Sequence, residues 1–138
     1  MSLVFFTDRD LGLRVAEILS ASGLNVERHR DHFAPDCPDE VWLTAVGKRR
    51  WVALTHDARI RYKPNELAAV RRHNVRLLVL VGKAPFPDLA TSFVHTYPRI
   101  ETFLNRETAP FIAKVYRAVP GDLAENSDAP GRIEHWWP

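Results

Sequence analysis

The chain has 138 residues, 46% of them hydrophobic and 26% charged, and this length and composition predict a single globular domain. No apolar run approaches the ~18–20 residues of a membrane helix, and the N-terminus lacks the pattern of a secretory signal. The single cysteine, Cys37, cannot form an internal disulfide. We therefore expect a cytoplasmic protein without membrane spans.

The net charge of +2 is spread unevenly. Residues 1–117 contain 18 basic and 13 acidic residues, whereas residues 118–138 contain one basic and four acidic residues. A basic body is compatible with a phosphate-bearing partner. The acidic C-terminal segment is expected to be a poorly ordered or docking tail, outside a folded domain at residues 1–117.

The first half of the chain alternates strand and helix patterns. Residues 3–7 form a short apolar run, residues 11–19 repeat apolar side chains at helical spacing, and residues 24–28 indicate a second short strand. A polar loop at residues 29–38 follows. Acids in a first helical turn then predict a helix that we expect Gly47 to end.

The second half continues the alternation. Strands are predicted at residues 51–54, 76–81 and 111–117, and helices at residues 64–72 and 87–107. We expect Pro98 to kink or split the last helix. Helical connections between short apolar strands indicate an α/β fold with a mainly parallel sheet that helices cover on both faces.

Acidic residues gather where the strands are predicted to end. Asp8 and Asp10 follow the first strand, Asp57 follows the third, and Asp39 and Glu40 begin a helix. In an open parallel sheet these positions lie at the same edge. Crowded carboxylates repel one another, and a hard divalent cation such as Mg²⁺ or Mn²⁺ relieves that repulsion.

Structural roles are open for most of these acids. Asp39 and Glu40 suit the positive end of a helix dipole, and Asp10 suits the N-cap of the first helix better than direct metal ligation. Asp57 is also a typical residue for starting a turn. Asp8 is the hardest to explain structurally, because it ends a buried strand.

Three kinds of α/β protein begin with such a strand. A phosphotransferase of the haloacid-dehalogenase type fits Asp8, Asp10 and Thr55, but the chain lacks the late acidic pair of that class. A response-regulator receiver fits the two early acids and Asp57. The residues after its fourth and fifth strands, however, do not supply the expected hydroxyl and Lys-Pro pair.

The third kind is a PIN-type nuclease. The stretches FFTDRDLG and PDEVWLTAVGKRRWVALTHDARI give an acid after the first strand, an acid on a short helix and Thr-x-Asp after the next strand. In this order they resemble the PIN-like domain family, in particular the small stand-alone toxins of the VapC type, over roughly residues 3–117. The resemblance implies a three-layer α/β/α sandwich and Mg²⁺- or Mn²⁺-dependent cleavage of RNA. It also implies a cognate antitoxin and leaves a homodimer open.

The resemblance also assigns residues. The catalytic acids and metal ligands would be Asp8, Asp39 and Asp57, with Glu40 and Asp10 as further candidate ligands and Thr55 in a supporting role. Independently of the resemblance, Arg59, Arg61 and Lys63 follow Asp57 directly, so we expect these residues, together with Arg9, to hold RNA beside the site. One departure concerns a fourth acid, since Gly82 and Lys83 stand where such nucleases commonly place it. Asp88 and Glu66 are the substitutes. An inert PIN-like binding module and a phosphotransfer domain remain the alternatives.

Overall fold

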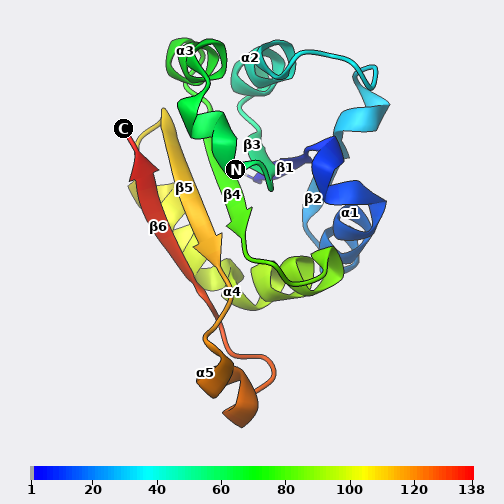
Figure 1. Cartoon of the computed structure of the whole chain (residues 1–138), viewed down its shortest axis with the longest axis vertical. Coiled ribbons are helices and arrows are strands. Elements are labelled where there is room, and N and C mark those ends of the chain that lie inside the picture. Colours follow the sequence, from blue (N-terminus) through cyan, green and yellow to red (C-terminus); the bar gives the residue numbers. More distant parts are fainter. Residues whose placement is uncertain (1) are drawn as a thin grey trace.

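The structure is a computed structural model that describes residues 2–138 (Figure 1). Its centre is a six-stranded sheet with the order β2-β1-β3-β4-β5-β6, in which β1 to β5 are parallel and β6 is antiparallel to β5. The strands are β1 (Val4–Thr7), β2 (Asn25–Arg28), β3 (Val52–Thr55), β4 (Arg76–Val81), β5 (Phe111–Tyr116) and β6 (Arg132–Trp137).

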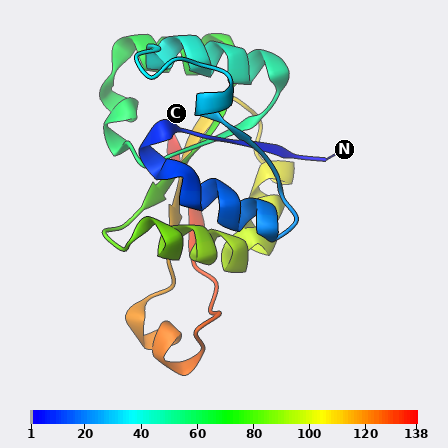
Figure 2. The same ribbon diagram turned by 90° about the vertical axis from the view of Figure 1, so that its right-hand side faces the viewer.

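Helices cover both faces of the sheet. The α-helices are α1 (Gly12–Ala21), α2 (Asp39–Arg49), α3 (Pro64–Arg72), α4 (Phe86–Arg106) and α5 (Pro120–Glu125), and the 3-10 helices are η1 (Arg9–Leu11), η2 (His29–Asp31) and η3 (Ala58–Tyr62). Figure 2 shows α2 and α3 on one side of the sheet and α1 and α4 on the other, with α5 projecting beyond them. The predicted three-layer α/β/α sandwich with a mainly parallel sheet is confirmed.

Alternating side chains of the strands supply a core on each face. Phe5 packs toward α1 and α4, where it meets Phe93 edge-on with ring centroids 5.6 Å apart. Phe6 points to the opposite face and stacks on Trp42 of α2 at 5.4 Å. This alternation is the period-two pattern of a strand that is buried on both faces.

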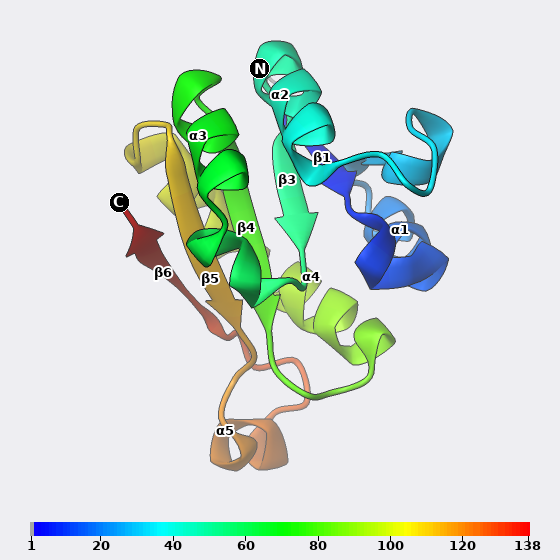
Figure 3. The same cartoon turned by 45° about the horizontal axis from the view of Figure 1, so that its top comes forward.

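The strand order places a crevice next to β1. From β1 the chain adds β2 on one side and then β3 on the other, so the connections leave in opposite directions at this point. Ligands in open α/β sheets bind beyond the carboxyl ends of the strands at such a switch. Thr7 and Thr55 end β1 and β3 there, and Figure 3 shows η1 and η3 continuing from these two strand ends.

Two helix details differ from the sequence predictions. Gly47 does not end α2, which continues to Arg49. It lies where α2 approaches the end of α3, and a Cβ at this position would collide with the carbonyl oxygen of His73. The residue that ends the helix is Arg50, in a left-handed conformation with φ of 59°. The helix α4 continues through Pro98 as one element, so the expected split is wrong.

The last part of the predicted tail is a strand. Residues 132–137 pair with β5 as β6, and Trp137 is buried. Lys114 of β5 lies over the ring of Trp136, with Nζ 3.9 Å from the ring centroid. Arg132, Glu134 and His135 hide the strand character of this segment, whereas its two tryptophans anchor it to the sheet. None of the helices in residues 2–138 combines the length and the apolar composition of a membrane span.

Candidate functional site

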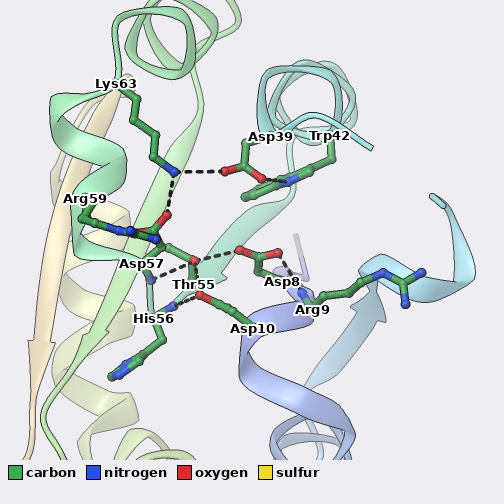
Figure 4. A network of polar contacts seen from close by, with 10 residues as sticks. All are labelled: Asp8, Arg9, Asp10, Asp39, Trp42, Thr55, His56, Asp57, Arg59 and Lys63. Carbon is green, nitrogen blue, oxygen red and sulfur yellow. Dashed lines mark hydrogen bonds and ion pairs between the residues drawn. The ribbon is translucent and has the colours of Figure 1, made fainter. Parts of the chain in front are cut away.

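A polar pocket lies at the crevice beside β1. It has a volume of about 590 Å³ and opens at the carboxyl ends of β1 and β3. Four carboxylates converge on it, two from the segment after β1, one from the start of α2 and one from the segment after β3 (Figure 4). The lining residues are Asp8, Arg9, Asp10, His29, Pro35, Cys37, Asp39, His56, Asp57, Ala58, Arg59 and Lys63.

The hydroxyl of Thr55 joins two of these acids. Its Oγ1 lies 2.8 Å from Oδ2 of Asp8 and 3.1 Å from Oδ2 of Asp10, and it accepts the backbone N–H of Asp57 at 3.2 Å. A hydroxyl has one hydrogen and donates to one acceptor at a time. The Thr55 hydroxyl can therefore donate to only one of the two carboxylates. The other carboxylate forms a hydrogen bond with Oγ1 of Thr55 only if that carboxylate is itself protonated.

The electrostatics of this pair agree with that geometry. Burial, the neighbouring Asp10 and the more distant Asp39 raise the pKa of Asp8 to about 7, against the lowering effect of the Thr55 hydrogen bond. Burial also raises the pKa of Asp10. Within residues 2–138, no lysine or arginine forms an ion pair with either acid. We call these two residues the Asp8–Asp10 pair; it is a site of crowded negative charge.

The other two acids are neutralised. Nζ of Lys63 lies 2.9 Å from Oδ2 of Asp57 and 3.7 Å from Oδ2 of Asp39. Asp39 also accepts the indole N–H of Trp42 at 3.0 Å, and Asp57 accepts both the backbone N–H and the Nε–H of Arg59. Burial raises the pKa of Asp57, but the hydrogen bonds from Lys63 and Arg59 outweigh it and lower that pKa. We call these two acids the Asp39–Asp57 pair.

The oxygen donors of the pocket suit a hard cation. Among residues 2–138, no three His, Cys, Asp or Glu side chains lie close enough together to hold an ion jointly. Mg²⁺ retains several waters and is commonly held by one or two carboxylates, so the Asp8–Asp10 pair fits one hydrated ion. The Asp39–Asp57 pair does not offer a second such position while Lys63 joins its two carboxylates.

Asp10 differs from its predicted role. It does not cap the first helix; Asp8 caps η1 instead, through the backbone N–H of Arg9. The carboxylate of Asp10 reaches across to β3, where it accepts the backbone N–H of His56 at 3.1 Å. Asp10 is thus the fourth acid of the pocket. Asp88, a substitute considered from the sequence, lines a separate pocket near α5.

Three of the other candidate residues have different surroundings from those expected. Glu40 lies outside the pocket and lines a groove between α2 and α3. Arg9 lines the pocket, but its Nε–H donates to Nδ1 of His29 and its Nη2 donates to the carbonyl of Phe33. Arg61 packs between aromatic rings, with its guanidinium carbon 5.3 Å from the ring centroid of Trp136.

The sequence did not predict the contacts that Lys63 and His29 make in the pocket. Lys63 was expected to hold RNA, whereas it bridges two carboxylates of the site itself. His29 is buried and receives the hydrogen bond of Arg9, and burial followed by the nearby Arg9 lowers its pKa. One sequence signal pointed to the contact between Lys63 and Asp57: Lys63 lies six residues after Asp57, the aspartate that follows β3.

Comparison with known proteins gives a family but no individual relative. Neither the curated proteins nor the solved structures contain a match to the chain. The family model described as PIN-like domain matches residues 3–82, more than half of the 138 residues. The match includes all four carboxylates of the pocket, Thr55 and Lys63, and it ends just after β4. The chain therefore belongs to the PIN-like domain family.

Proposed function

We propose that the protein is a divalent-cation-dependent endoribonuclease whose cation is held by the Asp8–Asp10 pair. The observation that carries the proposal is the sharing of one Thr55 hydroxyl by two carboxylates at the switch point of the sheet, the half-buried Asp8 and the exposed Asp10. This arrangement concentrates negative charge without a lysine or arginine partner in the described chain. A hydrated Mg²⁺ or Mn²⁺ neutralises such charge, and the nuclease-type fold of the family supports the reaction.

Each part of the pocket has a separate task in this proposal. The Asp8–Asp10 pair holds the ion, and Thr55 fixes the relative position of the two carboxylates. A bound divalent ion lowers the pKa of an attacking water and stabilises charge on a phosphate oxygen. No nucleophilic serine or cysteine is required for this chemistry.

Cations at the rim supply contacts for RNA. The side chain of Arg59 is 86% exposed while its Nε stays on Asp57, so the rest of the guanidinium faces solvent beside the pocket. Arginine pairs well with phosphate oxygens. Arg30 is exposed in the adjoining cavity, which shares Asp8, Arg9 and His29 with the pocket. These positions favour a polyanionic substrate that runs past the carboxylates.

At a finer level, we propose a toxin of the VapC type that acts in the cytoplasm and is inhibited by a cognate antitoxin. This step is supported by the resemblance of the FFTDRDLG and THDARI stretches. Induced expression is expected to arrest bacterial growth, and the Asp8→Asn variant is expected not to. Equal growth arrest by both proteins, at equal expression, would contradict a toxin that acts through this site.

The test of the reaction is incubation of the purified protein with mixed structured RNAs, first with Mg²⁺ or Mn²⁺ and then with excess EDTA. We expect cleavage that requires the metal and falls by at least about 10²-fold in Asp8→Asn. Asp88→Asn is the matched control, because Asp88 is an exposed acid of a different pocket. It should cleave like the wild type.

A folded protein that does not cut under either metal would contradict the proposal. Phosphotransfer is then the next candidate, because Asp57 follows β3, the strand beside β1, and its carboxylate accepts a hydrogen bond from Lys63. In that case acetyl phosphate should label Asp57, and Asp57→Asn should remove the label.

A further inference from the structure

Lys63 lies where the chain passes from η3 into α3, and its side chain reaches back into the pocket (Figure 4). The ammonium group is 2.9 Å from a carboxylate oxygen of Asp57 and 3.7 Å from one of Asp39. These two acids come from different layers of the fold, since Asp57 follows β3 and Asp39 begins α2. One lysine thus joins the two elements that flank the pocket opposite the Asp8–Asp10 pair.

We propose that the ammonium group of Lys63 occupies the position between Asp39 and Asp57 that a second divalent cation would otherwise take, so that the site binds one divalent cation instead of two. The inference rests on the proposed function, and it specifies how many divalent cations the site binds. Lys63 acts as a positioning residue and as a permanent counter-ion of the pocket.

The partners of the two carboxylates support this assignment. One oxygen of Asp39 accepts from Trp42 and the other faces Lys63. One oxygen of Asp57 accepts from Arg59 and the other accepts from Lys63. Asp57 therefore has a hydrogen-bond donor on each oxygen, and Asp39 has a hydrogen-bond donor on one oxygen and the ammonium group of Lys63 at ion-pair distance from the other. A second metal ion would have to displace the lysine and would then lie beside a displaced positive charge, which repels it.

The two pairs of carboxylates in the pocket differ in whether a positively charged side chain already neutralises them. The Asp8–Asp10 pair shares one hydroxyl and has no ion-pair partner in the described chain, whereas the Asp39–Asp57 pair is already bridged by a cation. Two-metal sites place both ions between carboxylates so that the attacking and leaving oxygens are both stabilised. Here a lysine supplies fixed positive charge on one of the two sides.

The test counts Mn²⁺ ions bound per chain from the electron paramagnetic resonance signal of free Mn²⁺. We expect about one ion for the wild type and about two for Lys63→Met, which retains the length of the side chain without its charge. Lys83→Met is the matched control, since Lys83 is an exposed lysine after β4 that does not line the pocket. It should bind one ion.

A second variant, Lys63→Gln, keeps the test valid if the apolar side chain of Lys63→Met disturbs folding, and it should also bind two ions. Two ions on the wild type, or one ion on both folded Lys63 variants, would overturn the inference. If the wild type binds two ions and cuts RNA, the inference fails and the proposed function stands. If the wild type neither binds Mn²⁺ nor cuts RNA, both fail.

Discussion

The two pairs of carboxylates in the pocket lie in different electrostatic environments, although the sequence presents all four acids in the same way. The Asp8–Asp10 pair is crowded around one hydroxyl, and the pKa values of both acids are raised by burial. The Asp39–Asp57 pair is bridged by Lys63, and the pKa of Asp57 is lowered by its hydrogen bonds despite its burial.

This difference in charge compensation indicates different roles for the two pairs of carboxylates. A carboxylate that is already matched by a lysine gains little from a metal ion, whereas one that is held close to another acid gains a great deal. We therefore propose the Asp8–Asp10 pair as the place where a cation binds, whereas the Asp39–Asp57 pair forms the opposite wall of the pocket.

The first prediction compares neighbouring acids at the start of α2. Asp39→Asn should lower metal-dependent RNA cleavage by about 10–100-fold, because Asp39 orients Lys63 and the indole of Trp42 at the wall of the pocket. Glu40→Gln changes the next carboxylate along the same helix, which faces another groove. Its cleavage rate should remain close to that of the wild type, and equal losses in the two variants would contradict the assignment.

The second prediction removes the hydroxyl that joins the first pair. Thr55→Val retains the shape of a fully buried side chain, but it leaves Asp8, Asp10 and the N–H of Asp57 without their shared partner. The free energy of unfolding should fall by about 1–3 kcal/mol in denaturant titrations. Thr44→Val is the control: its hydroxyl donates within α2 to the carbonyl of Glu40, and the change should cost less than about 0.5 kcal/mol.

The third prediction concerns pH. The pKa of Asp8 in the folded protein, about 7, lies above its ordinary value of 3.8, so between these values the folded state binds more protons than the unfolded state. The contribution of Asp8 to stability is therefore present at low pH and is lost as the pH rises through about 7. Asp57, whose folded pKa is lowered, contributes in the opposite sense: its stabilisation is lost as the pH falls below about 4.

Measured without metal, Asp8→Asn should therefore be more stable than the wild type at pH 8, by on the order of 1–2 kcal/mol, and the difference should shrink toward pH 5. Denaturant titrations in EDTA at the two pH values measure it. A stability gap between Asp8→Asn and the wild type that does not change with pH would show that Asp8 titrates normally.

The smallest expected effect compares two arginines of η3. Arg59→Ala should weaken RNA binding by about 3–10-fold and reduce its dependence on salt, because Arg59 is exposed at the rim. Arg61→Ala removes a guanidinium that packs on Tyr62 and Trp136, so it should change the midpoint of thermal unfolding more than RNA affinity. Fluorescence anisotropy with labelled RNA at two salt concentrations separates the two results.

Much of the scaffold follows from local pattern. The helix at Pro64–Arg72 and the strand at Arg76–Val81 agree with their predicted bounds, because proline, charged ends and apolar runs mark them directly. The rule that parallel strands end at one edge also predicts the convergence that brings Asp8, Asp39 and Asp57 to one pocket.

The parts that sequence reasoning missed depend on where long side chains go. Lys63 and Arg61 lie two residues apart in the same basic stretch, yet one bridges carboxylates and the other packs against Trp136 of β6. Their directions follow from the 3-10 turn of η3 and from the pairing of β6 with β5. The sequence of β6, with Arg132, Glu134 and His135 among its six residues, is not typical of a strand.

The most direct test of the account is the pH titration of the aspartate carboxyl carbons by ¹³C NMR, with and without Mg²⁺, using Asp8→Asn to assign the key resonance. The account predicts that Asp8 titrates with a pKa of about 7 without metal and that saturating Mg²⁺ lowers this pKa, because the bound ion favours the charged carboxylate. A pKa of Asp8 near its ordinary value in both conditions, or one that Mg²⁺ leaves unchanged, would contradict it.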